Sequence, residues 1–280
     1  MYRYLLNIFL ILIFTAPSVN AQGVADSTNI FRSWYFSLIP AKHIMPFSSA
    51  DETAHRISVS KITDNNNYRC SFGGIFPVAR FSNGKQLLQF SAAATYYTQF
   101  QRIHSHLIVT TGDYFVDLLA DLKLTKSFVL RFGKGHTSHH FLDDAFEIVK
   151  VSKSINYVRD YWQLLAAWDK DLYMFYAGTV YTYHFMINEN ISPQWQLKCG
   201  GELHSKKEYF YCYPYISFDI KLKGELDMAS TQNYQAGIYI KNKQDRKLRL
   251  AYDYHAGYDE RGQYYDYKHN YNSIGLFLEL

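Results

Sequence analysis

Long stretches in which polar and apolar residues alternate strictly are the feature that most limits what this chain can fold into. In residues 194–204, Gln196 and Lys198 fall on one face of a strand, because successive side chains of a strand point to opposite faces. Trp195 and Leu197 fall on the other face. Two further runs alternate in the same way, residues 113–123 and 209–223. Each run is long enough to cross a membrane as a tilted strand, which takes roughly 9 to 11 residues.

The same alternation along the rest of the chain predicts an all-β fold, a transmembrane antiparallel β-barrel of about 12 strands. An even number of strands is the rule for bacterial single-chain barrels. With the C-terminus on the periplasmic side, the turns on that side are short and most outside loops are longer, which is the expected asymmetry. The predicted strands are 54–62, 68–81, 86–99, 113–123, 127–140, 150–168, 172–186, 193–204, 208–222, 232–241, 247–258 and 271–280.

The inward face of the predicted strands carries both signs of charge. Asp117, Asp121, Arg131 and Arg159 all fall on this face. Unpaired charges in a narrow interior are costly, so we expect these side chains to pair across neighbouring strands. About twelve strands enclose a space that side chains can largely fill. The sequence therefore predicts a lumen largely filled by polar side chains, and no wide pore.

Two segments precede the predicted barrel. Residues 1–21 have the features of a secretory signal peptide, with a positive start at Arg3, a short apolar run and small residues at the cleavage site. Residues 22–53 show no clean period, and we interpret them as a lead-in or plug segment. Residues 54–280 form the predicted outer-membrane β-barrel. No later run is long and apolar enough for a transmembrane helix.

Composition narrows the choice of partners and of redox chemistry. Aromatic residues make up 18% of the chain, which fits strands that carry aromatic girdles at two membrane interfaces. The net charge of +4 is too small to argue for nucleic acid as a partner. Cys199 and Cys212 could face each other as a disulfide, but we favour the interpretation that these and Cys70 are three free apolar side chains facing lipid.

The C-terminal strand ends on an apolar residue in a defined pattern. Ser273, Gly275, Leu278 and Leu280 fill four positions that resemble the terminal signal of bacterial outer-membrane β-barrels, although that family usually ends on an aromatic residue. The resemblance implies a location in the bacterial outer membrane, contact with outer-membrane lipids, and the barrel assembly machinery as a partner through the C-terminal strand. A monomer and a homodimer both stay open.

One polar cluster lies at the end of the strand predicted over 127–140. His136 and Ser138 share the parity of Phe132, so they should face lipid near the outer leaflet. Asn156 has the corresponding parity on the next strand. A serine needs a general base to become a nucleophile, and the base needs an orienting group. We therefore predict a lipid acyl-ester hydrolase with Ser138 as nucleophile, His136 as base and Asn156 as the orienting residue.

Three known families carry similar motifs. Outer membrane phospholipase A is a barrel with a lipid-facing Ser-His-Asn triad, and its motif is H-x-S-N-G followed by a later segment that carries the Asn. The first part of this motif resembles His136-Thr137-Ser138, and the later segment resembles Ser152-Lys153-Ser154-Ile155-Asn156. Lipid A deacylase has a similar H-x-S-N dyad. An uncharacterised family of exported bacterial proteins has the motif H-x-S-S-H-L-G-D-E and a later I-N-Y strand. The residues that match it are His136, Ser138, His140, Asp143, Asp144 and 155–157. His139 and Leu142 depart from the motif. The last resemblance implies membership but no activity.

Three other interpretations stay open. An ordinary polar rim would make the protein a structural or adhesive barrel that uses outside loops such as residues 264–267. A metal site could form from His140, Asp143 and Asp144, since imidazole and carboxylate groups bind metal ions. In a hydrolase, either aspartate could instead hold calcium, which would polarise the ester carbonyl. The third interpretation is a narrow channel.

Overall fold

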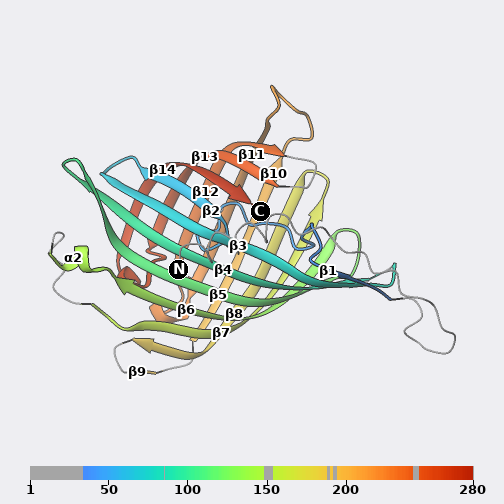
Figure 1. Cartoon of the computed structure of the whole chain (residues 1–280), viewed down its shortest axis with the longest axis horizontal. Helices are drawn as coiled ribbons and strands as arrows, with labels where there is room; N and C mark the ends of the chain where they lie inside the picture. The colour runs from blue at the N-terminus through green and yellow to red at the C-terminus, as the bar shows by residue number, and fades with distance from the viewer. Residues whose placement is uncertain are drawn as a thin grey trace, which may run out of the picture.

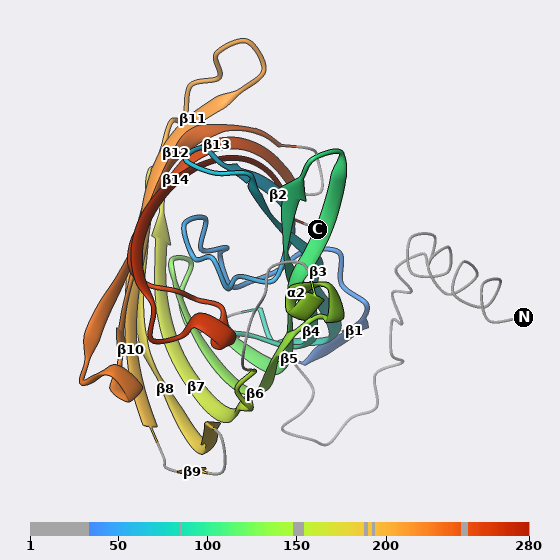
Figure 2. The same cartoon turned by 90° about the vertical axis from the view of Figure 1, so that its left-hand side faces the viewer.

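The computed structural model describes residues 34–84, 86–147, 154–187, 190–191, 194–241 and 246–279. Within these residues, fourteen strands form one sheet, and all their pairings are antiparallel. Twelve of the strands, all but the short β1 and β9, follow one another around a barrel in chain order, and β14 pairs with β2 to close it. Figure 2 shows the strands as a ring seen from one end. The predicted all-β barrel is confirmed.

The barrel strands have the bounds β2 Ile57–Ile62, β3 Asn67–Ser82, β4 Leu87–Ile103, β5 His106–Lys123, β6 Phe128–Phe141, β7 Tyr157–Lys170, β8 Tyr173–Ile187, β10 Gln194–His204, β11 Tyr213–Lys223, β12 Ala229–Lys241, β13 Lys247–Tyr258 and β14 Lys268–Glu279. The remaining elements are β1 Tyr35–Leu38, β9 Asn190–Ile191, the short helix α2 Asp143–Glu147, and the 3-10 turns η1 Gly224–Leu226 and η2 Gly262–Tyr264. All carry these labels in Figure 1 where there is room.

Each predicted strand corresponds to a strand of the barrel, but several boundaries differ; the strand predicted from residue 150, for example, begins only at Tyr157. Two further differences lie at turns. The strand predicted from residue 208 begins only at Tyr213, because Tyr209 and Cys212 pair with each other to close a tight turn. The outside loop predicted over 100–112 is mostly strand, since β4 and β5 continue to a turn at His104 and Ser105. Turn chemistry, which alternation does not report, decides both boundaries.

The two faces of the wall differ as predicted. Leu118, Phe132 and Leu164 are among the exposed apolar side chains of the outer face, at 65%, 50% and 51% exposure. On the inner face, Arg131 binds Asp121 with an Nε–Oδ1 distance of 2.6 Å. The other two charges of the predicted set do not pair with members of that set, because Asp117 accepts a hydrogen bond from the Tyr161 hydroxyl and Arg159 lies 3.5 Å from Glu225. The predicted assignment of side chains to the inner and outer faces of the wall is therefore confirmed. The predicted charge pairs are confirmed only in part.

The N-terminal part of the described chain enters the lumen. Two short strands pair with the same long strand, β3. β1 pairs with residues 79–82 of β3, and β2 pairs with residues 68–71. Residues 39–56, which we call the plug segment, leave the wall between these two strands. In Figure 2 they form the blue loops inside the ring. The signal peptide predicted over 1–21 lies outside the described residues.

Two smaller findings complete the fold. Among the described residues, no helix is long and apolar enough to cross a membrane. Cys70, Cys199 and Cys212 are free thiols, as we favoured.

Candidate functional site

The predicted nucleophile and base lie on the outer face of β6. Along this strand, Thr137 and His139 are buried in the lumen, whereas His136 is exposed and Ser138 is half-buried on the opposite side. Strand alternation therefore turns the His-x-Ser pair away from the lumen, as the sequence predicts. Val116 and Tyr114 of β5 lie opposite these two residues and are exposed apolar side chains of the same wall.

The imidazole of His136 is held by a carboxylate from the next strand. The strand register places Asp160 of β7 directly opposite His136. The Nδ1 of His136 lies 2.7 Å from one carboxylate oxygen of Asp160. The other oxygen of Asp160 lies 2.9 Å from the Nδ1 of His184 on β8. One carboxylate thus orients two imidazoles from neighbouring strands, on the outer wall.

A β-bulge turns His184 outward. The register between β7 and β8 shifts between Asp160 and Tyr161, which leaves Tyr183 without a partner opposite it. Thr182 and Phe185 on either side are buried in the lumen. The extra residue therefore lets Tyr183 and His184 both leave the lumen face, a re-aiming that bulges often produce beside functional sites.

The other predicted triad residue, Asn156, lies further along the wall. The last paired residues of β6 and β7 are His139 and Tyr157, so Asn156 precedes the paired part of β7. Its Nδ2 lies 3.7 Å from the Sδ of Met186. Among the described residues, the hydroxyl of Ser138 has no hydrogen-bond partner. The structure therefore brings His136 together with Asp160, and places Ser138 beside them on the same face.

The predicted metal ligands lie around the end of β6. His140 is exposed on the outer wall and its ring lies 6.0 Å from that of Tyr114. Asp143 is exposed at the start of α2, and the side chain of Asp144 lies outside the described part. Among the described side chains, no group of three or more His, Cys, Asp or Glu residues could hold a metal ion.

Aromatic side chains lie on the strands next to the His136–Asp160 pair. Phe132 and Trp162 stack across β6 and β7 with ring centroids 5.2 Å apart. Lys134 extends its Nζ to 5.3 Å from the Trp162 ring, and Tyr183 contacts the same ring from β8. Aromatic rings with a basic side chain are typical of the level at which a barrel meets lipid head groups.

The lumen holds a second, much larger polar network. Asp51 of the plug segment binds Lys198 and Lys221 of the wall, each at 2.7 Å. His55, also in the plug segment, places its Nε2 2.6 Å from Asp117. The plug segment is thus tied to strands on several sides of the barrel.

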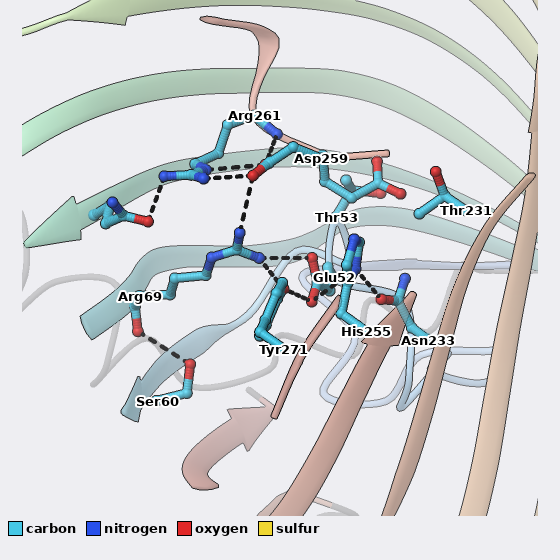
Figure 3. A network of polar contacts seen from close by, with 12 residues as sticks. Glu52, Thr53, Ser60, Arg69, Thr231, Asn233, His255, Asp259, Arg261 and Tyr271 are labelled. Carbon is cyan, nitrogen blue, oxygen red and sulfur yellow. Dashed lines mark hydrogen bonds and ion pairs between the residues drawn. The ribbon is translucent and has the colours of Figure 1, made fainter. Parts of the chain in front are cut away.

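The loop between β13 and β14, residues 259–267, also folds into the lumen. Arg69 of β3 joins this loop to the plug segment, since its guanidinium lies 3.0 Å from Glu52 and 3.2 Å from Asp259 (Figure 3). Further along the loop, the backbone N–H of Gly262 donates to the Nδ1 of His139 at 3.0 Å. Two pockets, of about 460 and 420 Å³, open at the two ends of the barrel. Two cavities between them, lined in part by the plug segment, have volumes of only about 110 and 80 Å³. The lumen is filled, as predicted.

The carboxylates of the plug segment and of the inward loop are stabilised in their charged form. Burial raises the pKa of Asp51, but Lys198 and Lys221 lower it more, so that its pKa lies well below the usual range. Burial likewise raises the pKa of Asp259, and the neighbouring Arg261 and Arg69 bring that pKa well below the usual range. Both groups are therefore anions at neutral pH.

Comparisons with known proteins place this barrel in a family. The model of DUF1207, a family of proteins of unknown function, matches residues 34–279. The chain belongs to the DUF1207 family. No curated protein matches this DUF1207 chain. Among solved structures, the in-vitro folded trimer form of OmpT, an outer membrane protein of Vibrio cholerae, is similar at 10% identity and a TM-score of 0.35, over 80% of the DUF1207 chain and 96% of that chain. Membership of a family of unknown function is confirmed, whereas the H-x-S-S-H-L-G-D-E motif and the likeness to phospholipase A stay predictions.

In this DUF1207 protein, the outer-wall group has the components of a nucleophilic site. With its Nδ1–H donated to Asp160, the imidazole of His136 keeps a lone pair on Nε2 and can accept a proton. Ser138 is two residues away on the same face, about 7 Å along the strand. Among the described residues, no hydrogen bond joins its hydroxyl to the imidazole of His136, so the substrate would have to bring the two groups together. Asp160 and His184 are the residues that sequence reasoning missed. The alternation of the sequence places Asp160 on the outer face, which was available as a signal. Its contact with His136, however, depends on the register between β6 and β7.

Proposed function

We propose that this DUF1207 protein resides in the bacterial outer membrane and hydrolyses acyl esters of outer-leaflet lipids. The location is supported by the apolar outer face, where side chains such as Leu118, Phe132 and Leu164 are exposed around a polar, filled interior. Such a surface is unfavourable in water and favourable in hydrocarbon. With the C-terminal strand ending at the periplasmic face, the His136–Asp160 pair lies towards the outer leaflet.

The observation that carries the proposed activity is the 2.7 Å contact between His136 and Asp160 on the lipid-facing wall. Charged groups on a lipid-facing surface are costly and rare, so an ion pair in this position supports a functional role. An imidazole that is oriented by a carboxylate and lies beside a serine hydroxyl is the arrangement of a serine hydrolase. We assign Ser138 as nucleophile, His136 as base and Asp160 as the orienting residue, in place of Asn156.

The reaction follows from these roles. The Oγ of Ser138 attacks the ester carbonyl carbon while the Nε2 of His136 takes the hydroxyl proton. The bond to the alcohol part of the lipid then breaks, and His136 returns the proton to the leaving oxygen. Water, activated by the same imidazole, hydrolyses the acyl-serine and releases a fatty acid. Asp160 holds the tautomer and stabilises the imidazolium that forms in each step.

A calcium ion is part of the proposal as an activator. Asp143 and Asp144 lie at the start of α2, just beyond the outer end of β6, and a calcium ion held by either would polarise the ester carbonyl. Calcium therefore enters the test as a separate condition, and activity that needs no calcium would leave the roles of Ser138 and His136 unchanged.

The test is fatty acid release by the purified barrel from phospholipid and from lipopolysaccharide, each with and without calcium. We expect release by the native protein and almost none by Ser138→Ala or His136→Ala. Ser127→Ala, in the turn at the opposite end of β6, is the matched control and should keep full activity. Release that persists in Ser138→Ala would remove Ser138 from the mechanism. No release under any condition would favour a structural or adhesive barrel, and recovery of the mature protein in the soluble periplasm would contradict the location.

A further inference from the structure

The hairpin between β10 and β11 ends in an unusual turn. The backbone N–H of Tyr209 donates to the carbonyl of Cys212 at 2.8 Å, and the N–H of Cys212 donates back to Tyr209 at 3.0 Å. Phe210 and Tyr211, the two residues between them, have φ values of 50° and 66°. This is a two-residue turn of the type that requires a positive φ at both central positions.

The residue types in this turn are costly for the fold. Asn and Gly normally fill such positions, because the Cβ of other residues crowds the backbone when φ is positive. Phe210 is 97% exposed and Tyr211 is 81% exposed, so contacts within the described chain do not offset this cost. Strain at exposed bulky residues points to a contact outside the chain.

The position of the turn indicates what that contact is. The hairpin is at the end of the barrel where β14 also ends, and in Figure 2 it extends outward beyond the ring of strands, near the label β11. Its base continues from Leu203, which is exposed on the outer wall opposite the exposed Tyr173 of β8. The aromatic tip therefore lies beyond the apolar outer face, with the polar residues 204–208 between Leu203 and the tip.

We propose that Tyr209, Phe210 and Tyr211 form an anchor that inserts into the head-group region of the membrane leaflet at the C-terminal end of the barrel. Tyrosine rings, with an apolar body and a polar hydroxyl, favour this interface. Lys207, whose Nζ lies 5.2 Å from the Tyr209 ring, adds a cation for lipid phosphates. The anchor rests on the proposed membrane location and is independent of the proposed hydrolase.

The experiment is tryptophan quenching in lipid vesicles of phosphatidylethanolamine and phosphatidylglycerol. The emission added by Phe210→Trp, relative to the native protein with its 4 Trp, is measured with brominated lipids and with aqueous iodide. We expect brominated lipids to quench at least about half of the added emission, and iodide to have little effect, as for an interfacial ring. Tyr211→Trp is measured in parallel. Leu118→Trp on the outer wall is the lipid-facing control, and Tyr267→Trp in the inward loop is the control outside lipid.

The outcomes separate the anchor from the membrane location. Iodide quenching at positions 210 and 211, with lipid quenching at Leu118→Trp, would overturn the anchor and leave the location intact. Absence of lipid quenching at Leu118→Trp would overturn both. As a second measurement, the double variant Phe210→Asn/Tyr211→Gly should relieve the turn and raise the unfolding midpoint in detergent. An unchanged or lower midpoint would show that the turn carries no strain and would overturn the inference drawn from it.

Discussion

At the scale of single residues, Asp160 is the group on which the outer-wall site depends. Its two oxygens lie 2.7 Å from His136 and 2.9 Å from His184, so both imidazoles are fixed through Nδ1. Each ring thereby directs its Nε2 away from the carboxylate. Only the ring of His136 has a serine on its own strand face two residues away, which is why His136 and not His184 is assigned as the base.

Replacing Asp160 should separate its role from that of Asn156. Asp160→Asn keeps the shape of the side chain but permits the wrong imidazole tautomer, so we expect kcat to fall by about 10² to 10⁴ with little change in KM. Asn156→Ala should lower kcat by less than about 10-fold, because its Nδ2 contacts Met186. Steady-state kinetics of both variants check this. The reverse order of effects would return the orienting role to Asn156.

The sequence was sufficient to place His136 and Ser138 on the outer wall, because strand parity is a local property. It did not pair His136 with Asp160, because that contact depends on how two strands are aligned. His184 was further out of reach, since the bulge at Tyr183 reverses the parity of the strand around it. Alternation reports which face a residue is on and does not report which residue lies opposite.

At the scale of elements, the plug segment is held mainly by charge. Asp51 lies between Lys198 and Lys221 inside the lumen, at 2.7 Å from each. Lys221 also lies 3.2 Å from Glu260 and 3.5 Å from Asp219, so Lys198 depends more strongly on Asp51. Asp51→Asn leaves these buried cations undercompensated, and we expect a loss of about 3 kcal/mol in the free energy of unfolding. Asp171→Asn is the matched control, because its pair with Lys206 is more than half exposed on both sides and should leave the free energy of unfolding nearly unchanged. Urea unfolding followed by gel mobility measures both, and equal losses would contradict the assignment.

The plug segment should be released in acid and not in base. The pKa values of Asp51 and Asp259 are both below their usual range, so each carboxylate stabilises the folded lumen fully above the unfolded pKa of about 4. This contribution is lost as the pH falls from about 4 through the lower folded values. Protease access to residues 39–56 in vesicles should therefore stay constant from about pH 6 to 8 and rise only below about pH 4. Access that rises towards pH 8 would contradict this sign.

The sequence could not decide whether the residues before the barrel form a lead-in or a plug. Residues 39–56 contain no period, and their placement depends on contacts with residues far along the chain, such as Lys198 and Lys221. The barrel strands were predictable because each has its own pattern. The plug segment has none, since its side chains meet several strands in turn.

At the scale of the whole molecule, the protein is a barrel with an apolar outside and a blocked polar inside. The plug segment and the inward loop meet at Arg69, and the pockets at the two ends open on opposite sides of this contact. We expect no steady ion conductance across planar bilayers at neutral pH and moderate voltage. Stable channels of uniform conductance in the native protein would contradict a filled lumen and would favour the narrow-channel interpretation.

The most direct test of the proposed function is covalent labelling of the native barrel in lipid vesicles by a lipophilic fluorophosphonate, with the modified residue located by mass spectrometry. The proposal predicts an adduct on Ser138 that is greatly reduced in His136→Ala, reduced in Asp160→Asn and unchanged in Ser127→Ala. No adduct on Ser138, or one that forms equally in His136→Ala, would contradict a serine nucleophile activated by that imidazole.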